Sequence, residues 1–376
     1  MISGALDFVC LQVGKDVARR FETVTKISGS RTRLSKRTIK RYYQKAAQSK
    51  WNRSFLHKAG LFVEHGELFY NKRFSGEGIV VEEYIRDLYH DELRDGFLVT
   101  FDRKKVWNVE LNLVREFDRI CKKYDLTYFM SYGTLLGAVR HQGFIPWDDD
   151  IDLMMPRPDY DRLKKVIVGE LPPYYFFQDL YTDKRFVLGM SKLRDSRTSA
   201  IQYPEVKDIH QGIFIDIDAL DATSDGSPEE EEILAMQGEI WATVYNPEGI
   251  LEGIRQGAKS YLPTEELLAL VQLPREERMR QFEAIAAERY GSSRMVNMLV
   301  SAICGNSVSM ERQWFDKLIE LPFESFHLPA PAAYDEILRR AYGDYHQFVQ
   351  GVSSHENLLF SADIPYTECL EKIDFP

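Results

Sequence analysis

Acidic residues within an apolar strand pattern are the clearest chemical signal in this sequence. Residues 131–155 read SYGTLLGAVRHQGFIPWDDDIDLMM, and Asp149–Met155 is expected to be a strand. Because strand side chains alternate between two faces, Asp148, Asp150 and Asp152 should project to the same side. Carboxylates gathered on one face of a buried strand are costly unless a cation neutralises them. Oxygen ligands suit Mg²⁺ or Mn²⁺, so these aspartates are candidate metal ligands.

A second group of acids lies on another predicted strand, residues 212–218, which read GIFIDID. Its isoleucines alternate with Asp216 and Asp218, so both acids project from the same face, about 7 Å apart by strand rise. We expect Asp216 to be a further metal ligand and to complete a catalytic set with Asp150 and Asp152. Asp216 is also a candidate acceptor for the proton of an attacking hydroxyl group. Asp218, nearer the end of the strand, would line the acceptor side or meet solvent.

The turn that precedes the first acidic strand could bind a diphosphate. Gly133 and Thr134 open a short predicted helix, residues 135–139. Backbone N–H groups at a helix N-terminus attract anions, so both residues are predicted to bind the diphosphate of a donor, although a plain helix cap would use the same residues. Three basic residues are candidates to neutralise phosphate charge or, alternatively, to form salt bridges: Arg140, Lys192 and Arg194.

Several kinds of site could use these acids. A calcium loop that began at Asp148 would need glycine at its sixth position and glutamate at its twelfth, where this chain has Leu153 and Asp159. A metal-dependent glycosyltransferase would hold a nucleotide sugar through an acid-x-acid pair, but it gives no role to the Gly-Thr turn or to Asp216. A nucleotidyltransferase palm has the turn, the acid-x-acid strand and a third acid in this order. A catalytically silent binding module is the alternative outside enzymes, and the intact acids argue against it.

Helical and strand patterns surround these motifs. Apolar spacing from Val106 to Cys121 predicts a helix over residues 103–123 with Asp102 as its N-cap. Ser227 and Pro228 suit the start of another helix, with acids in its first turn. Alternating elements from 103 to 220, with mostly helices beyond, favour an α/β or α+β protein. The other predicted elements are strands at 126–130 and 186–193 and helices near 158–168, 264–271, 276–290, 310–319 and 334–341.

The composition is that of a globular protein of 376 residues, and its net charge of −10 argues against nucleic acid as a partner. The four cysteines have no paired spacing, which indicates neither zinc nor disulfides and suits a reducing compartment.

No signal peptide or membrane-spanning run is recognisable, so the protein is expected to be cytoplasmic. Residues 31–53 carry nine Lys or Arg and no acid. That run fits either the inner face of a membrane or a solvated helix surface.

The stretch 131–155, with the helix before it, resembles the LicD family of phosphotransferases, which is related to the fukutin-related proteins. The resemblance implies an α+β fold, in which a nucleotidyltransferase-like mixed sheet is flanked by helices and followed by a mainly helical C-terminal part. It covers roughly residues 87–350. Its further motifs are Lys192-Leu193-Arg194, GIFIDIDALD, Phe323-Glu324, Tyr334-Asp335 and Tyr342-Gly343-Asp344-Tyr345.

The resemblance also implies a reaction: transfer of a phosphoryl-linked group, typically phosphocholine from CDP-choline, to a glycan, a teichoic-acid-like polymer or a lipid-linked sugar. We expect an N-terminal extension over 1–85, a catalytic core over 86–225 and a helical region over 226–376 that packs on the core. The family usually has Phe-Pro after the strand acid, where this chain has Asp218-Ala219. The predicted metal ligands are Asp148, Asp150, Asp152 and Asp216.

Overall fold

The computed structural model describes residues 61–64, 67–70, 84–85, 88–349 and 358–372. The chain separates into two compact units that share strand β10 (Ile213–Ala222). The first, here called the site unit, comprises Ser35–Asp218 and Lys317–Pro376. The second, here called the helical unit, is described over Ala219–Asp316. All the candidate site residues belong to the site unit.

Helix α4 (Phe101–Tyr124) is the long helix of the site unit. Its N-cap is Thr100, whose side chain accepts a hydrogen bond from the backbone N–H of Arg103. The predicted N-cap at Asp102 is therefore wrong, and Asp102 lies instead in the first turn, where an acid favours the helix dipole. Asp125 ends the helix in the left-handed conformation.

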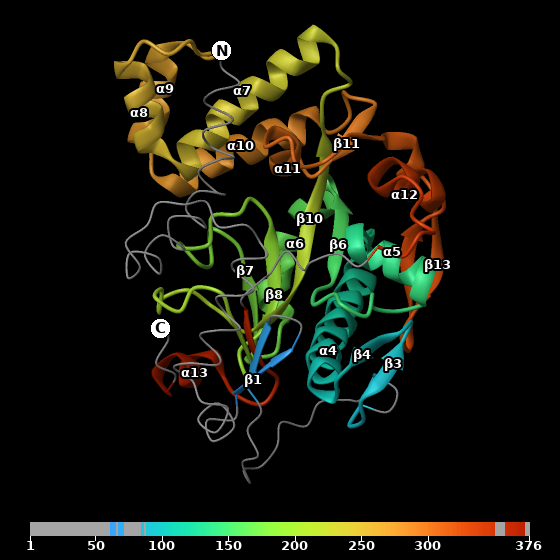
Figure 1. Ribbon diagram of the computed structural model, residues 1–376. Helices are drawn as coiled ribbons and strands as arrows, with labels where there is room; N and C mark the ends of the chain where they lie inside the picture. The colour runs from blue at the N-terminus through green and yellow to red at the C-terminus, as the bar shows by residue number, and fades with distance from the viewer. Residues whose placement is uncertain (1–60, 65–66, 71–83, 86–87, 350–357, 373–376) are drawn as a thin grey trace, which may run out of the picture. The chain divides into compact units, whose positions relative to one another are not determined.

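The sheet of the site unit has the strand order β5–β6–β10–β8–β7 (Figure 1). β10 pairs with β8 antiparallel, and on its other side the N–H of Asp216 donates to the carbonyl of Ile151, 2.8 Å away. The strand that carries Asp216 therefore lies beside the strand that begins at Asp152. The other bounds are β5 (Phe129–Met130), β6 (Asp152–Pro156), β7 (Tyr175–Gln178) and β8 (Ser191–Asp195).

Helices flank this sheet, which confirms the predicted α+β class. α5 (Tyr132–His141) follows β5, and α6 (Arg157–Glu170) follows β6. Val106 and Val109 of α4 share a buried hydrophobic core with Phe214 of β10 and Phe360 of the C-terminal strand β15 (Leu359–Ser361). Burial of these side chains fixes α4 against the strand that carries the second group of acids.

Three smaller β structures complete the site unit. A four-stranded sheet has the order β1–β2–β15–β9, and two hairpins are formed by β3 with β4 and by β13 with β14. The remaining bounds are β1 (Leu61–Glu64), β2 (Glu67–Tyr70), β3 (Glu92–Arg94), β4 (Phe97–Val99), β9 (Ser199–Ile201), β13 (Leu318–Phe323), β14 (Phe326–Pro331), α12 (Tyr334–Tyr342) and α13 (Tyr366–Lys372).

The helix predicted near residues 310–319 is wrong. Its residues form strand β12 (Met310–Glu311), the short 3-10 helix η1 (Arg312–Phe315) and the start of β13. The β13–β14 hairpin contains Pro322, Pro329 and Pro331, and proline cannot donate a backbone hydrogen bond inside a helix. A two-stranded hairpin tolerates these prolines because each strand has a free edge.

The helical unit is built mainly on α7 (Pro228–Tyr245), which begins where the sequence predicts. Ser227 is its N-cap and accepts a hydrogen bond from the N–H of Glu230, with Pro228 in the first turn. The other elements of this unit are α8 (Pro247–Arg255), α9 (Thr264–Gln272), α10 (Arg275–Arg289), β11 (Met295–Asn297) and α11 (Leu299–Ile303), together with β12 and η1.

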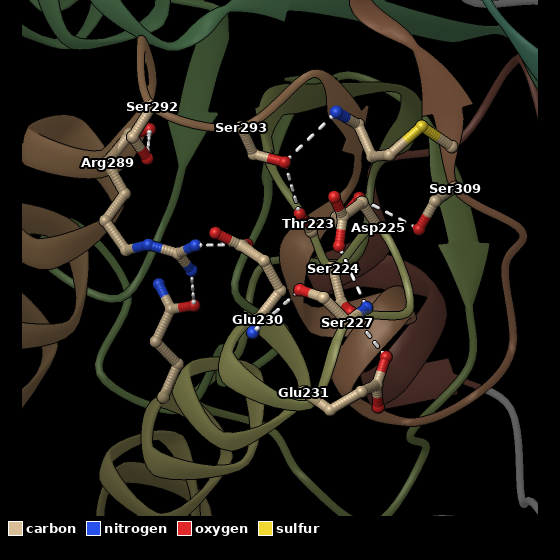
Figure 2. A network of polar contacts seen from close by, with 12 residues as sticks. Thr223, Ser224, Asp225, Ser227, Glu230, Glu231, Arg289, Ser292, Ser293 and Ser309 are labelled. Atoms are coloured by element: carbon tan, nitrogen blue, oxygen red, sulfur yellow. Dashed lines mark hydrogen bonds and ion pairs between the residues drawn. The ribbon is translucent and has the colours of Figure 1, made fainter.

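A polar network ties the end of β10 to these helices (Figure 2). The hydroxyl of Ser293 donates to the carbonyl of Thr223, 2.8 Å away, and the hydroxyl of Ser224 donates to Glu231 in α7. In α10, Arg289 donates to Glu230 of α7 at 2.5 Å. These bonds, all within the helical unit, fix the chain between the end of β10 and the start of α7.

A close backbone contact in the site unit gives a stability test. A Cβ added at Gly137 in α5 would lie 2.4 Å from the carbonyl oxygen of Gly143, whereas a Cβ at Gly169 in α6 would meet nothing within 4 Å. Gly137→Ala should lower the free energy of unfolding by about 1–3 kcal/mol, the usual cost of overpacking. Gly169→Ala, the matched control, should raise it by up to about 1 kcal/mol because alanine favours helix.

Chemical denaturation of both variants measures this difference. Equal stability of Gly137→Ala and the unmodified protein would mean that α5 and the loop after it do not approach as closely as described.

Candidate functional site

The carboxylates of Asp150, Asp152 and Asp216 form the centre of the site. Each offers an oxygen, and these oxygens lie within 4.8 Å of one another. Asp152 is the first residue of β6, Asp150 lies in the loop before it, and Asp216 lies on the neighbouring strand β10. The structure therefore brings together the acid-x-acid pair and the third acid. Asp218, which lies further along β10, is outside this group.

The first acidic strand is shorter than predicted, which corrects the argument from alternating faces. β6 begins at Asp152, so Asp148 and Asp150 lie in a loop. The carbonyl of Asp148 accepts hydrogen bonds from the guanidinium of Arg103, at 2.9 Å, and from the indole N–H of Trp107, at 3.0 Å. Because both donors belong to α4, these hydrogen bonds fix the loop against that helix. Asp148, Asp149 and Asp150 form a second group of neighbouring carboxylate oxygens.

Two acids at the site have strongly perturbed acidity. Burial, followed by the charges of Asp150 and Asp216, raises the pKa of Asp152 well above its usual value. Burial, followed by the charges of Asp150 and Asp149, likewise raises the pKa of Glu110 in α4. Among the described residues, Oε2 of Glu110 is buried and has no hydrogen-bond partner.

These carboxylates fit a divalent cation. The donor set is all oxygen, as Mg²⁺ and Mn²⁺ prefer, and the raised pKa values mean that the site disfavours its own negative charge. Bound positive charge would remove that cost. Glu110 was not predicted, although a charged residue between Val109 and Leu111 on the apolar side of the α4 pattern was a signal for it.

Lys192 is the basic candidate that the structure places beside the acids. Its ammonium forms a buried ion pair with Asp216 and lies 3.6 Å from the centre of the Phe214 ring. Burial lowers the pKa of Lys192, whereas the neighbouring charge of Asp216 opposes that change. A cation in this position partly offsets the negative charge of the three aspartates.

The other two basic candidates have partners elsewhere. Arg194 is buried and donates to the side chain of Gln178 and to the carbonyl of Gly212, 2.7 Å away. Arg140 donates to the carbonyl of Tyr345 at 3.1 Å. Neither contact involves the three central aspartates, so a role for Arg140 and Arg194 in phosphate binding stays a prediction.

The Gly-Thr turn lies directly against the acids. The hydroxyl of Thr134 accepts a hydrogen bond from the N–H of Asp152 at 2.8 Å, and the N–H of Ser131 donates to the carbonyl of Asp152 at 3.1 Å. A Cβ on Gly133 would lie 2.7 Å from a carboxylate oxygen of Asp148. The N-terminus of α5 is thus fixed next to the candidate metal ligands, and a side chain at position 133 would have to displace the carboxylate of Asp148.

Glu324, in the turn between β13 and β14, holds the loop that leads to the acids. Its carboxylate pairs with Arg94 and accepts a hydrogen bond from the N–H of Phe144 at 3.1 Å. Its own N–H donates to the carbonyl of Gln142 at 2.8 Å. A Cβ on Gly143 would collide with the Glu324 side chain. Sequence reasoning found the Phe323-Glu324 motif but assigned it no role.

An α+β sheet with an acid-x-acid pair, a third acid on the adjacent strand and a helix N-terminus beside them is the arrangement of a nucleotidyltransferase-type site. Residues 125–228 match the family model described as LicD/FKTN/FKRP, nucleotidyltransferase domain. Residues 125–228 are therefore similar to the nucleotidyltransferase domain of the LicD family.

Three curated proteins illustrate this similarity. The lipopolysaccharide cholinephosphotransferase LicD of Haemophilus influenzae is 37% identical over 125 residues, which are 33% of this chain and 44% of that protein. An uncharacterised protein of Rickettsia prowazekii is 40% identical over 55 residues, 15% of this chain and 21% of its own length. Mannosyltransferase regulator 4 of Saccharomyces cerevisiae is 26% identical over 165 residues, which are 41% of this chain and 13% of that protein. The chain thus spans less than half the length of each.

Charge repulsion at the site predicts a stabilising substitution. In metal-free protein, Asp152→Asn should raise the midpoint of thermal unfolding at neutral pH, because it removes a disfavoured charge and keeps the side chain's shape. The folded state holds the Asp152 proton to higher pH than the unfolded chain does. The stability of the wild type should therefore fall as the pH rises from the ordinary aspartate pKa to the raised pKa of Asp152. The stability of Asp152→Asn should fall less over the same pH range.

Thermal unfolding in excess chelator across this pH range measures the effect. Asp208→Asn is the matched control, since Asp208 forms an exposed ion pair with Arg185 and its removal should change little. A lower midpoint for Asp152→Asn than for wild type at neutral pH would contradict the repulsion argument.

Proposed function

We propose that this protein transfers phosphocholine from CDP-choline to a hydroxyl group of a cell-surface glycan or its precursor, with Mg²⁺ or Mn²⁺ as cofactor. The observation that carries the proposal is the group formed by Asp150, Asp152 and Asp216, whose oxygens lie within 4.8 Å of one another. The cholinephosphotransferase activity in the name of the Haemophilus influenzae relative supports phosphocholine as the transferred group. The choice of nucleotide and metal rests on the chemistry of this site and on the family resemblance.

Asp150, Asp152 and Asp216 would hold the metal, with Asp148 as a further ligand. A divalent cation bound there would neutralise the diphosphate of the donor and favour departure of CMP. The protein's own groups then act mainly by position and charge. The N–H groups that open α5 around Gly133 would face the diphosphate, next to the carboxylate of Asp148.

In the proposed reaction, the acceptor oxygen forms a bond to the phosphorus of phosphocholine while the bond from that phosphorus to CMP breaks. The acceptor's proton passes to a base, for which Asp216 is the candidate. The ion pair with Lys192 would fix the orientation of the Asp216 carboxylate. Lys192 would also add positive charge near the diphosphate.

The setting of the reaction is a further part of the proposal. Within the described ranges, every helix is too short or too polar to cross a bilayer. We place the enzyme in the cytoplasm, where basic residues 31–53 would bring it to the inner face of the membrane and to a lipid-linked acceptor. That segment lies outside the described residues.

Two substitutions test whether Asp150 binds the metal and Asp218 does not. Asp150→Asn should lower metal-dependent release of CMP from CDP-choline by at least about 100-fold, because a lost ligand costs more than a lost supporting contact. Asp218→Asn is the matched control, being a buried acid on β10 outside the central group. It should keep metal-dependent CMP release.

The measurement is CMP release with and without chelator, with circular dichroism to confirm folding. Full activity of Asp150→Asn, or activity in excess chelator, would overturn the metal-dependent mechanism. Loss of activity in Asp218→Asn with Asp150→Asn unaffected would mean that the ligands are wrongly assigned.

A further inference from the structure

Strands β7, β8 and β10 lie side by side in the sheet of the site unit and carry two neighbouring rows of side chains (Figure 1). In one row, Arg194 of β8 lies opposite Phe214 of β10. In the next row, Lys192 of β8 lies between Gln178 of β7 and Asp216 of β10. Residues directly opposite each other, and residues two apart on one strand, point to the same face of a sheet. These five side chains therefore share one face.

Two cations are buried two residues apart on β8. Lys192 is 3% exposed and Arg194 is 4% exposed. Buried like charges repel each other and have lost their hydration, so each needs partners that fix it in place. Lys192 forms its ion pair with Asp216. Arg194 instead donates to two neutral acceptors, the side-chain oxygen of Gln178 and the carbonyl of Gly212.

The ring of Phe214 contacts both cations. The ammonium of Lys192 lies 3.6 Å from the centre of this ring, and the guanidinium of Arg194 lies 4.7 Å from it. An aromatic face attracts cations, and the attraction is stronger where water is excluded. Phe214 is itself buried. The ring therefore connects the cation that pairs with Asp216 to the cation that is bonded to β7.

Arg194 has a fixed anchor at its other end. The side-chain amide of Gln178 donates to the carboxylate of Asp183 at 2.7 Å and to the carbonyl of His210 at 3.2 Å. The N–H of His210 donates to the same carboxylate at 2.9 Å. A guanidinium is planar and its donors point in fixed directions, so partners held in this way fix its orientation. The contacts of Arg194 thus set the position of the guanidinium against the Phe214 ring.

We propose that Phe214 and Arg194 are positioning residues that hold the Lys192 ammonium on the carboxylate of Asp216. This inference rests on the proposed function and concerns its candidate base. A lysine ammonium sits on a flexible four-carbon stem and can turn its donors toward any nearby oxygen, including those of a diphosphate. The ring and the ion pair confine the ammonium, so the carboxylate of Asp216 keeps one orientation. The two residues then act on proton transfer to Asp216 and leave binding of the donor unaffected.

The first measurement uses the full chain without metal or donor. A lysine ammonium gives a proton–nitrogen NMR signal at neutral pH only where its exchange with water is slow, and the Lys192 signal is identified by its absence from Lys192→Gln. We expect this signal in wild type, with exchange about 3- to 30-fold faster in Phe214→Leu, the range that one buried cation–ring contact supplies. Arg194→Lys should also speed exchange, because it keeps the charge but loses the planar group. Phe214→Tyr, which keeps the ring, should retain the slow exchange.

Phe360→Leu is the matched control. Phe360 lies on β15 and belongs to the same buried core as Phe214, so its loss shows what a weakened core does by itself. The Lys192 signal of this control should match that of wild type. Equal acceleration in Phe360→Leu and Phe214→Leu would overturn the proposal, as would a wild type without a slowly exchanging Lys192. Unchanged exchange in Arg194→Lys would also overturn it, and this variant decides the matter if Phe214→Leu does not fold.

The second measurement separates positioning from direct binding of the donor. Phe214→Leu should lower kcat for release of CMP from CDP-choline about 3- to 30-fold and leave KM for CDP-choline unchanged, because the lost contact acts in the transition state alone. A raised KM with unchanged kcat would mean that Lys192 binds the diphosphate, and it would overturn the proposal. A wild type that releases no CMP would count against the proposed reaction, whereas the exchange of Lys192 would still decide the role of Phe214 and Arg194.

Discussion

Mutual repulsion among closely spaced carboxylates is the constraint on which this structure depends. Asp150, Asp152 and Asp216 lie within a few ångströms of one another in a setting that raises the pKa of Asp152. Such an arrangement destabilises the protein unless positive charge is supplied. Lys192 supplies part of it through its ion pair with Asp216. The remaining negative charge is what would make the site a receptor for a divalent cation and, through it, for a diphosphate.

The surrounding elements hold the acids together against this repulsion. Arg103 and Trp107 of α4 fix the carbonyl of Asp148 from one side, and Glu324 fixes the start of the same loop from the other. Thr134 bonds the N–H of Asp152. These contacts come from segments far apart in sequence, so the geometry of the site is a property of the whole unit. Sites that store repulsion in this way are typically functional, because stability alone would not select them.

The sequence predicted the local chemistry better than the long-range supports. Acid alternation within GIFIDID pointed to Asp216, which lies beside Asp150 and Asp152, because that signal lies within a few residues. The Gly-Thr turn was predicted to bind a diphosphate, and its hydrogen bond to the N–H of Asp152, eighteen residues away in the sequence, was not predicted. The strand predicted at Asp149–Met155 begins only at Asp152. Two donors from α4 bind the carbonyl of Asp148 in the loop before it, and no local sequence pattern reveals a partner some forty residues away. For the same reason the roles of Glu110 and Glu324 were missed. The β13–β14 hairpin was mistaken in part for a helix, because apolar spacing in short segments fits either structure.

A crystal structure with Mn²⁺ and CDP-choline tests the central claim most directly, since the anomalous signal of manganese locates the ion independently of the model of the protein. The account predicts a manganese peak coordinated by Asp150, Asp152 and Asp216, with the donor's diphosphate on the open side of the ion near Gly133. A peak coordinated elsewhere, or a donor bound with no manganese at these three carboxylates, would contradict it.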